Sequence, residues 1–284
     1  MSVLSFHAIL RALPRQVFAL IVLAAPPRTF AHAPDGQQIE RLNAEIRVHP
    51  HDVDLLLRRA GVLKETGHSE DAARDYQLVL ELDPHCVEAH LGQAGLLLDG
   101  GNVAAAQQAL EHCPKGDAVL EAERWKIQSA IFRAQHSYVE AATALDHSIQ
   151  INPTPRPEDY IQRADLAMDA GLPDEAMAAL DRGIAELNGA VALRWRAIDL
   201  AIETQLTESA LVQLDHLEKV MPGSALVCAR RGDVFAACGR SLEAGAAWTD
   251  ALARIESTPV SQRSPADQSL AKRLRGDLAM ETAR

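Results

Sequence analysis

Aromatic residues are scarce in this chain of 284 residues, where Phe, Tyr and Trp together make up 4 %. Strand-rich folds draw on aromatic and β-branched side chains, because these pack well on a pleated surface. Here alanine and leucine supply most of the apolar content, which reaches 48 %. That composition favours close packing of helices. It also excludes a disordered chain, since there is enough apolar material to build a core.

Basic residues are also in short supply. The chain has 28 lysines and arginines against 39 aspartates and glutamates, so its net charge is −11. Nucleic acids and anionic lipid surfaces attract proteins with basic patches, and we therefore expect no nucleic-acid partner. With 4 cysteines and 16 glycines, the composition also excludes disulfide-dense and collagen-like proteins.

Sequence motifs of enzymes and metal sites are missing. The chain lacks HExxH, a CxxC pair, GxSxG, a Walker loop and a dinucleotide-binding fingerprint. Histidines such as His49, His51 and His85 fall between the expected helices, at spacings that fit no compact metal site. We therefore expect a noncatalytic protein with no cofactor and no metal.

Acidic residues are absent from residues 1–31, which contain three arginines. An uncharged apolar run over 17–25 follows two of them, and it is too short for an ordinary transmembrane helix. With small residues near Ala31, this pattern predicts a cleaved signal peptide over 1–31; an uncleaved amphipathic anchor is the alternative. Cleavage would remove three positive charges and take the net charge from −11 to −14. The expected location is periplasmic or secreted, with no stable membrane insertion after cleavage.

The remainder of the chain repeats itself with a period of 34 or 35 residues. Each repeat reads as two amphipathic helices joined by a tight turn. The predicted units span 53–86, 87–121, 122–156, 157–190, 191–224 and 225–256.

Small residues recur at the places where the helices of a unit would cross. The eighth place of the first helix holds Ala60, Ala94, Ser129, Ala164 and Gly232, and the second helix carries Ala72, Ala106, Ala141, Ala176, Ala210 and Ala244. A larger residue four places after each of these alanines would fill the space between units. The turn carries Gly67, Gly101, Gly171 and Gly239, where a helix end favours a left-handed residue. Pro84, Pro153 and Pro222 end second helices.

This pattern resembles the tetratricopeptide-repeat (TPR) family, of the bacterial exported type, over roughly residues 36–256. The resemblance implies an all-α, right-handed superhelical α-solenoid of about six helix pairs. A capping helix is expected within 32–52, and a polar break with a solvating helix within 257–284. Unit two departs from the pattern by ending early at Cys113-Pro114, and unit five has Gln205 in place of the turn glycine. Pentatricopeptide repeats share the period but bind RNA, which the acidic charge disfavours.

In the TPR family the first helices line a concave groove that binds an extended peptide or a partner helix. By this resemblance the expected groove residues are Lys126, Arg133, Ile161, Asp165, Met168, Asp169, Trp195, Asp199, Glu203, Arg230 and Asp233. The last three units repeat an aspartate every 34 residues, so these carboxylates should form a ladder that favours a basic partner. The carboxylate clamp of the chaperone-binding subclass is absent, because only Lys126 matches it.

Two of these groove features have a second interpretation. Arg196 lies three residues before Asp199, and Arg230 lies three before Asp233, which is the spacing of local ion pairs that need no ligand. Trp195 is the side chain best suited to anchor a partner, or it packs against a neighbouring helix.

The cysteines leave a similar choice. Cys86 and Cys113 lie at the two ends of one predicted helix pair, so a disulfide could join them in an oxidising compartment. The alternative is that both are small buried apolar residues. Cys228 and Cys238 lie about 15 Å apart along one helix, which is too far for a bond.

The sequence favours a noncatalytic scaffold that holds a protein or peptide partner in the groove, in the cell envelope. One alternative is an envelope enzyme, for which Asp165, Asp169 and Asp199 are the candidate acid/base residues. Another is a homo-oligomeric structural component, which would expose apolar area on its convex face. Partner identity and oligomeric state stay open.

Overall fold

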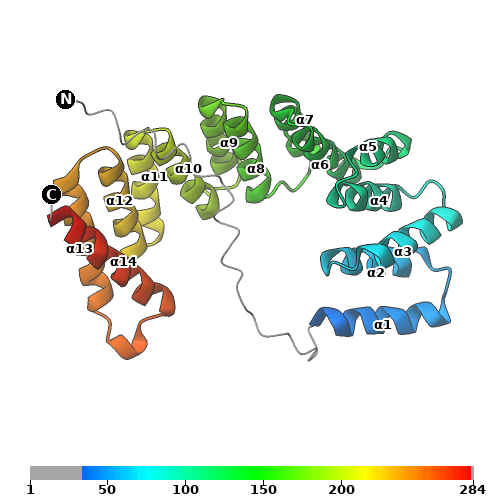
Figure 1. Cartoon of the computed structure of the whole chain (residues 1–284), viewed down its shortest axis with the longest axis horizontal. Helices are drawn as coiled ribbons and strands as arrows, with labels where there is room; N and C mark the ends of the chain where they lie inside the picture. The colour runs from blue at the N-terminus through cyan, green and yellow to red at the C-terminus, as the bar shows by residue number, and fades with distance from the viewer. Residues whose placement is uncertain (1–33, 283–284) are drawn as a thin grey trace. The chain divides into compact units, whose positions relative to one another are not determined.

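A computed structural model describes residues 34–282 (Figure 1). Within that range the chain forms fourteen α-helices and one short 3-10 helix, with no β-strand. The all-α solenoid of paired helices expected from the sequence is confirmed. The predicted signal peptide over 1–31 lies outside the described residues. None of the described helices is long and apolar enough to cross a membrane.

The helices follow one another in pairs along the chain. Their bounds are α1 (Pro34–Val48), α2 (Val53–Glu65), α3 (Ser69–Leu82), α4 (Val87–Asp99), α5 (Val103–His112), α6 (Ala118–Ala134), α7 (Tyr138–Ile151), α8 (Pro157–Asp169), α9 (Pro173–Glu186), α10 (Val191–Glu203), α11 (Thr207–Val220), α12 (Ala225–Ala237), α13 (Ser241–Glu256) and α14 (Pro265–Thr282). The described chain divides into two compact units, with the boundary between Leu78 and Val79 inside α3.

Each pair turns through a residue with positive φ. These residues are Gly67, Gly101, His136, Gly171, Gln205 and Gly239, with φ between 61° and 80°. In each case the next N–H donates to a carbonyl five residues back, as in the bond of 2.8 Å from His68 to Leu63. This closure satisfies carbonyls that the helix end would leave unpaired. The turn therefore has one geometry in all six pairs, although two of them lack glycine.

Alanines mark the crossing of the two helices in each pair. Ala72, Ala106, Ala141, Ala176, Ala210 and Ala244 are all fully buried. The residue four places on from each is buried too, from Tyr76 and Leu110 to Trp248. Small side chains thus let the helix axes approach, and the larger ones fill the layer beside them.

In the first unit, α1 packs on α2 through the buried side chains of Leu42 and Ile46. Arg59 on α2 forms two bonds, of 2.6 and 2.7 Å, with the buried carboxylate of Asp75 on α3, and it donates to Asn43 on α1. The guanidinium therefore ties three helices together, and its partner raises the pKa of Arg59.

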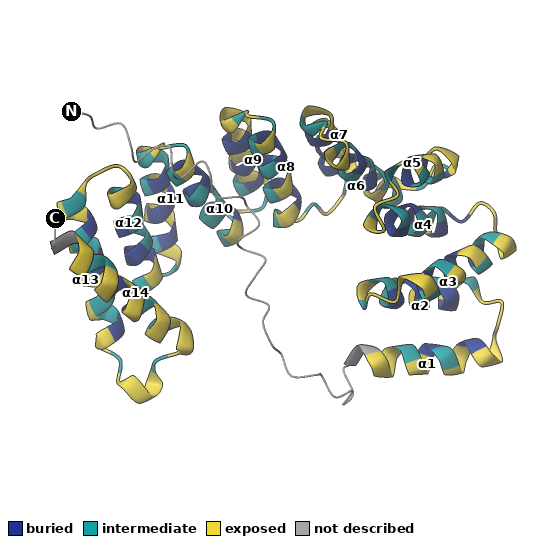
Figure 2. Ribbon diagram, viewed as in Figure 1, coloured by how far each residue is buried: buried dark blue, intermediate teal, exposed yellow. Residues whose placement is uncertain are grey.

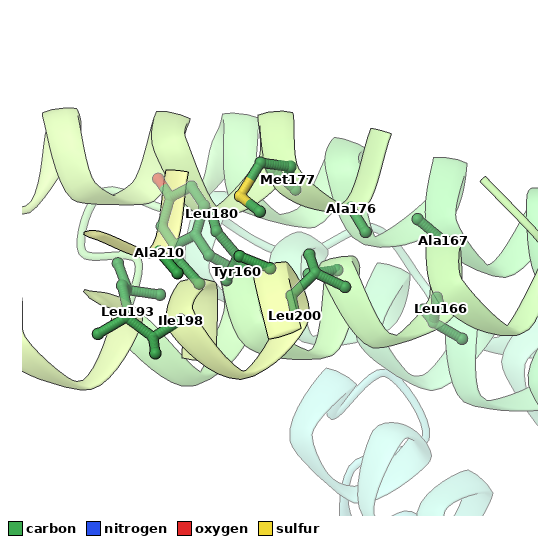
Figure 3. Packing of buried hydrophobic residues seen from close by; sticks show 14 of the residues in the cluster. Tyr160, Leu166, Ala167, Ala176, Met177, Leu180, Leu193, Ile198, Leu200 and Ala210 are labelled. Carbon is green, nitrogen blue, oxygen red and sulfur yellow. The ribbon is translucent and has the colours of Figure 1, made fainter. Parts of the chain in front are cut away.

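The second unit has its largest core between α7 and α12. Buried residues lie along the helix faces that point toward one another, and exposed residues lie on the opposite faces (Figure 2). Tyr160, Leu180, Leu193, Ile198 and Leu200 are fully buried in this cluster (Figure 3). The Tyr160 hydroxyl donates to Glu186, and burial together with that carboxylate raises the pKa of the phenol. The core is continuous over several pairs rather than centred on one.

The second pair is irregular, as the sequence indicated. α5 has 10 residues, where α7, α9 and α11 have 14, and it ends at His112, with Cys113 as its C-cap before Pro114. α6 begins at Ala118, upstream of the unit start expected at residue 122, and has 17 residues. Arg124 on α6 donates to the carbonyls of Leu110 and Cys113. Its guanidinium thus supplies hydrogen-bond donors that a further turn of α5 would otherwise supply.

The C-terminal helix α14 packs on the last pair. Its residues Ala271 and Leu274 are buried in one cluster with Trp248 and Ile255. The expected solvating helix therefore covers apolar surface with one face while its other face stays exposed. A 3-10 turn (Val260–Gln262) occupies the polar segment that precedes it.

Candidate binding groove

The predicted groove residues lie on the first helices of four pairs in the second unit. Lys126 and Arg133 are on α6, Ile161, Asp165, Met168 and Asp169 on α8, Trp195, Asp199 and Glu203 on α10, and Arg230 and Asp233 on α12. α8 and α10 contact each other directly. Side chains from different pairs thus lie close enough to interact.

A cavity of about 220 Å³ lies between α6, α7 and α8. Four of the predicted groove residues line it: Lys126, Arg133, Asp165 and Asp169. Gln162, which the sequence analysis did not single out, lines it as well. The cavity therefore gathers cationic, anionic and amide groups from two neighbouring first helices.

Lys126 uses its ammonium group within the protein. Its Nζ lies 2.7 Å from a carboxylate oxygen of Asp159, whose side chain is 3 % exposed. The other carboxylate oxygen of Asp159 accepts the backbone N–H of Arg156 at 2.9 Å, at the start of α8. Lys126 thus neutralises a buried helix cap, and Arg133 has no carboxylate partner among the described residues.

The three predicted aspartates form ion pairs that cross from one helix pair to the next. Asp165 pairs with Arg196 at 2.7 Å, and Asp199 pairs with Arg230. Asp233 pairs with Arg273 on α14 at 2.9 Å and accepts the Trp248 indole N–H at 3.0 Å. We call this row of aspartates and arginines the Asp–Arg ladder. Arg196 and Arg230 each come from the first helix of the following pair, and Arg273 comes from α14.

Local pairing accounts for only part of the ladder. Arg230 does lie 3.4 Å from Asp233 on its own helix. Arg196, however, pairs with Asp165 and with Glu203, at 3.5 Å, instead of with Asp199. The aspartates are thus spaced as expected, but a guanidinium lies beside each of them.

The apolar groove residues rest on the main core. Ile161, Met168 and Trp195 are each partly buried and pack against the cluster between α7 and α12. Trp195 therefore packs on the core with part of its side chain still accessible, and its role as an anchor for a partner stays a prediction.

No protein-family model matches the chain. Similar solved structures include the type IV pilus biogenesis factor PilW, which is 14 % identical with a TM-score of 0.54 and covers 66 % of this chain and 88 % of its own. PilF of Pseudomonas aeruginosa is 14 % identical with a TM-score of 0.52, and covers 79 % and 97 %. The APC/C complex Cut9–Hcn1 is 13 % identical with a TM-score of 0.51, and covers 84 % and 46 %.

PilF and PilW are TPR proteins, and the helix pairs described above have the same arrangement. This chain has the fold of a TPR solenoid. At these identities the likeness establishes the fold. Among curated proteins, human protein O-mannosyl-transferase TMTC1 is 25 % identical over 192 residues. That match covers 60 % of this chain and 22 % of the relative, so the chain spans about a fifth of the length of the relative it matches.

Arg230 was among the predicted groove residues, but the pairing of Arg196 and Arg230 with aspartates of the preceding helix pair was not predicted. Arg196 and Arg230 are 34 residues apart, the same interval as the aspartates, so the signal was present. Arg273 breaks that interval because the polar segment before α14 intervenes. Asp159 was missed because a carboxylate early in a helix ordinarily indicates a solvated cap.

The structure holds the four cysteines as free thiols. Cys86 lies near Glu88, and Cys113 lies 3.9 Å from the Val87 carbonyl. Burial raises the pKa of both thiols. The predicted disulfide between them is not formed here and stays a hypothesis. No group of three or more His, Cys, Asp or Glu suited to a metal occurs in the part of the chain that the structure describes.

Proposed function

We propose that the chain is a noncatalytic scaffold that holds a peptide or protein partner in the groove lined by α6, α8, α10 and α12. The observation that carries this proposal is the cavity between α6 and α8, where charged and amide side chains from successive TPR units converge. Partly buried apolar side chains, Trp195 among them, continue the same row of helices. Such a mixture of an aromatic anchor and polar groups is typical of binding surfaces.

The charges of the Asp–Arg ladder support a partner with a few basic side chains. Counting Glu203 and Asp277, five carboxylates share three guanidinium groups. The excess of negative charge is therefore small, because arginines neutralise most of what the aspartate spacing suggested. A partner with a few basic side chains fits better than a highly basic one.

We also propose that the protein works in the cell envelope. This rests on the basic, then apolar, then small-residue pattern of residues 1–31. The mass of the protein recovered from an envelope fraction tests it. A mass that matches a chain starting near residue 32 supports export, and an uncleaved chain in the cytoplasm contradicts it.

Site-specific photo-crosslinking tests the groove. A benzophenone amino acid at Gln162, which is exposed and lines the cavity, should capture a discrete partner in cells. The same group at Ala185, exposed on the second helix α9, is the matched control and should capture none.

Two groove variants complete that test. Trp195→Ala removes a partly buried side chain, and Asp199→Ala removes a half-buried one whose partner Arg230 keeps Asp233. Both should weaken the crosslink from Gln162. Equal crosslinking from Gln162 and Ala185, or no change in either variant, contradicts the groove assignment.

A further inference from the structure

Helix α6 also lines a second cavity, on a different flank from the groove. This cavity has a volume of about 200 Å³. Its lining residues are Gln107, Leu110 and Glu111 from α5 and Arg124, Trp125 and Gln128 from α6, and none of them lines the groove cavity. It lies against the last turn of α5, the helix that ends early at Cys113-Pro114.

Trp125 forms the aromatic wall of this cavity. Its side chain is partly buried, and the ring of His147 from α7 lies 4.8 Å from it, centroid to centroid, at an angle of 36°. Since His147 contacts the indole from α7 and the cavity lies toward α5, the ring is held in place while part of it faces the open space. The indole N–H has no acceptor among the described residues.

Glu111 supplies a carboxylate on the opposite wall. One of its oxygens accepts a hydrogen bond from Gln107 at 3.0 Å, and Gln107 in turn accepts one from Gln128 at 3.1 Å. This chain of amides orients the carboxylate. The described residues provide no lysine, arginine or histidine within ion-pair distance of Glu111.

Arg124 is the one cation in the lining, and it is already engaged. Its guanidinium donates to the carbonyls of Leu110 at 3.2 Å, Cys113 at 2.9 Å and Pro114, and its Nε lies 3.3 Å from Glu121. Because the two terminal nitrogens donate to these carbonyls and Nε is buried beside Glu121, Arg124 is not available to Glu111. The groups of the cavity lining that remain available to a ligand are the aromatic ring of Trp125 and the carboxylate of Glu111, which has no ion-pair partner in the part of the chain that the structure describes.

We propose that this cavity binds the guanidinium group of an arginine side chain presented by a protein partner. A guanidinium stacks on an indole ring through cation–π attraction, and its planar fork matches a carboxylate in two parallel hydrogen bonds. A lysine ammonium lacks that fork. The net charge of −11 attracts such a partner. This site is separate from the groove, and binding at it does not require the groove to be occupied.

The test uses the full chain labelled with ¹⁵N and titrated with Nα-acetyl-arginine amide. The chain has 3 tryptophans, so the indole N–H resonances of Trp125, Trp195 and Trp248 are resolved and assigned by single Trp→Phe variants. The Trp125 indole resonance should shift saturably, with a dissociation constant in the millimolar range. Neutral Nα-acetyl-citrulline amide should produce no saturable shift.

Glu111→Gln keeps the shape of the side chain but removes its charge, and it should weaken binding by about fivefold or more. Glu140→Gln is the matched control, because Glu140 is exposed on α7 outside the cavity lining, and it should bind as the unchanged protein does. Equal shifts with the citrulline or lysine amide overturn the proposal. Unchanged affinity in Glu111→Gln, or a shift of Trp195 without one of Trp125, overturns it as well.

Discussion

Gly232 shows how a single residue sets the spacing of two helices. A Cβ atom at this position would lie 2.3 Å from Cδ1 and 2.4 Å from Nε1 of Trp248. The indole is 7 % exposed and is held by its hydrogen bond to Asp233, so it has no room to move away. The small residue and the large one are therefore matched to each other across α12 and α13.

Gly232→Ala should lower the free energy of unfolding by about 2 kcal/mol, because overpacking costs more than the helix preference of alanine returns. Urea denaturation followed by tryptophan fluorescence measures it. Gly245→Ala is the control on α13, where nothing lies within 4 Å of an added Cβ, and it should be neutral or stabilising. Equal stabilities of the two variants would show that the helices are not in close contact at Gly232.

Burial of the Cys228 thiol should make the protein less stable at alkaline pH. Burial, with a hydrogen bond to Asp250, raises the pKa of Cys228 to about 11 from its ordinary value of 9.0. The native state thus favours the neutral thiol. Its stabilising effect is complete below the unfolded pKa and is lost as the pH rises from 9.0 toward about 11.

Urea midpoints should therefore fall between about pH 8 and about pH 10.5, and Cys228→Ala should reduce that fall because it removes one of the titrating groups. Cys238→Ser, at an exposed position, should leave the fall unchanged. If Cys238→Ser reduced the fall in urea midpoint more than Cys228→Ala did, the assignment to Cys228 would be contradicted.

Mass spectrometry after alkylation in urea without reductant should count four free thiols. A count of two would instead support the bond between Cys86 and Cys113.

At the scale of elements, the Asp–Arg ladder links α8 to α10, α10 to α12 and α12 to α14. The pair of Asp165 and Arg196 has two hydrogen bonds, of 2.7 and 2.9 Å, with the arginine side chain 20 % exposed. Partial burial makes such a pair stronger than an exposed one. The ladder should thus stabilise the stacking of units in addition to shaping the groove.

A double-mutant cycle with Asp165→Asn and Arg196→Gln should give a coupling free energy of about 0.5–1 kcal/mol, decreasing in 1 M salt. The control pair is Arg240 and Glu243, which are exposed and lie on one helix turn. Its coupling should be smaller. If both pairs have the same coupling free energy, the ion pair between units is no stronger than an exposed pair within one helix turn.

The turn between α10 and α11 uses a residue that fits it poorly. Gln205 has φ of 61°, a conformation that costs a side-chain-bearing residue roughly 1–2 kcal/mol. The N–H of Leu206 nevertheless closes the turn on Ala201 at 2.8 Å, because packing of the two helices dictates the geometry.

Gln205→Gly should raise the free energy of unfolding by about 0.5–1 kcal/mol, since the relief of strain in the native turn exceeds the stabilisation that the unfolded chain gains from added flexibility. The thermal midpoint reports the change. Gln135→Gly is the control, because Gln135 ends α6 with φ of −86°, and there glycine should destabilise. A loss of stability in Gln205→Gly would mean that the turn is not left-handed.

At the scale of the whole molecule, stability should be distributed unit by unit. α14 buries Ala271 and Leu274 against the last TPR unit and contributes Arg273 to the ladder. The described helices form separate buried clusters, so the loss of α14 should not spread through every unit.

Deletion of residues 265–284 should lower hydrogen-exchange protection in α12 and α13, because their apolar face becomes exposed, while α8 and α9 keep most of theirs. Exchange measured by mass spectrometry resolves these segments. Arg275→Ala, which removes an exposed pair with Glu256, should change neither region. A uniform loss over all helices would indicate one cooperative core.

The sequence by itself determined the period, the helix pairs, the buried alanines and the turn positions. These features depend on constraints within one helix pair, such as the space available to Ala176 at a crossing or the φ of Gly171, and local residue types record such constraints directly. His136 and Gln205 show the limit of that record, since the same turn forms there without glycine.

Only the tertiary structure decided which charges meet. The i,i+3 spacing favoured Arg196 with Asp199, but the offset between α8 and α10 places it beside Asp165, 31 residues earlier. Lys126 is paired with Asp159 for the same reason, and the cavity beside Trp125 depends on how α5, α6 and α7 pack. Such contacts follow from distances between units, which a repeating pattern of residue types does not specify.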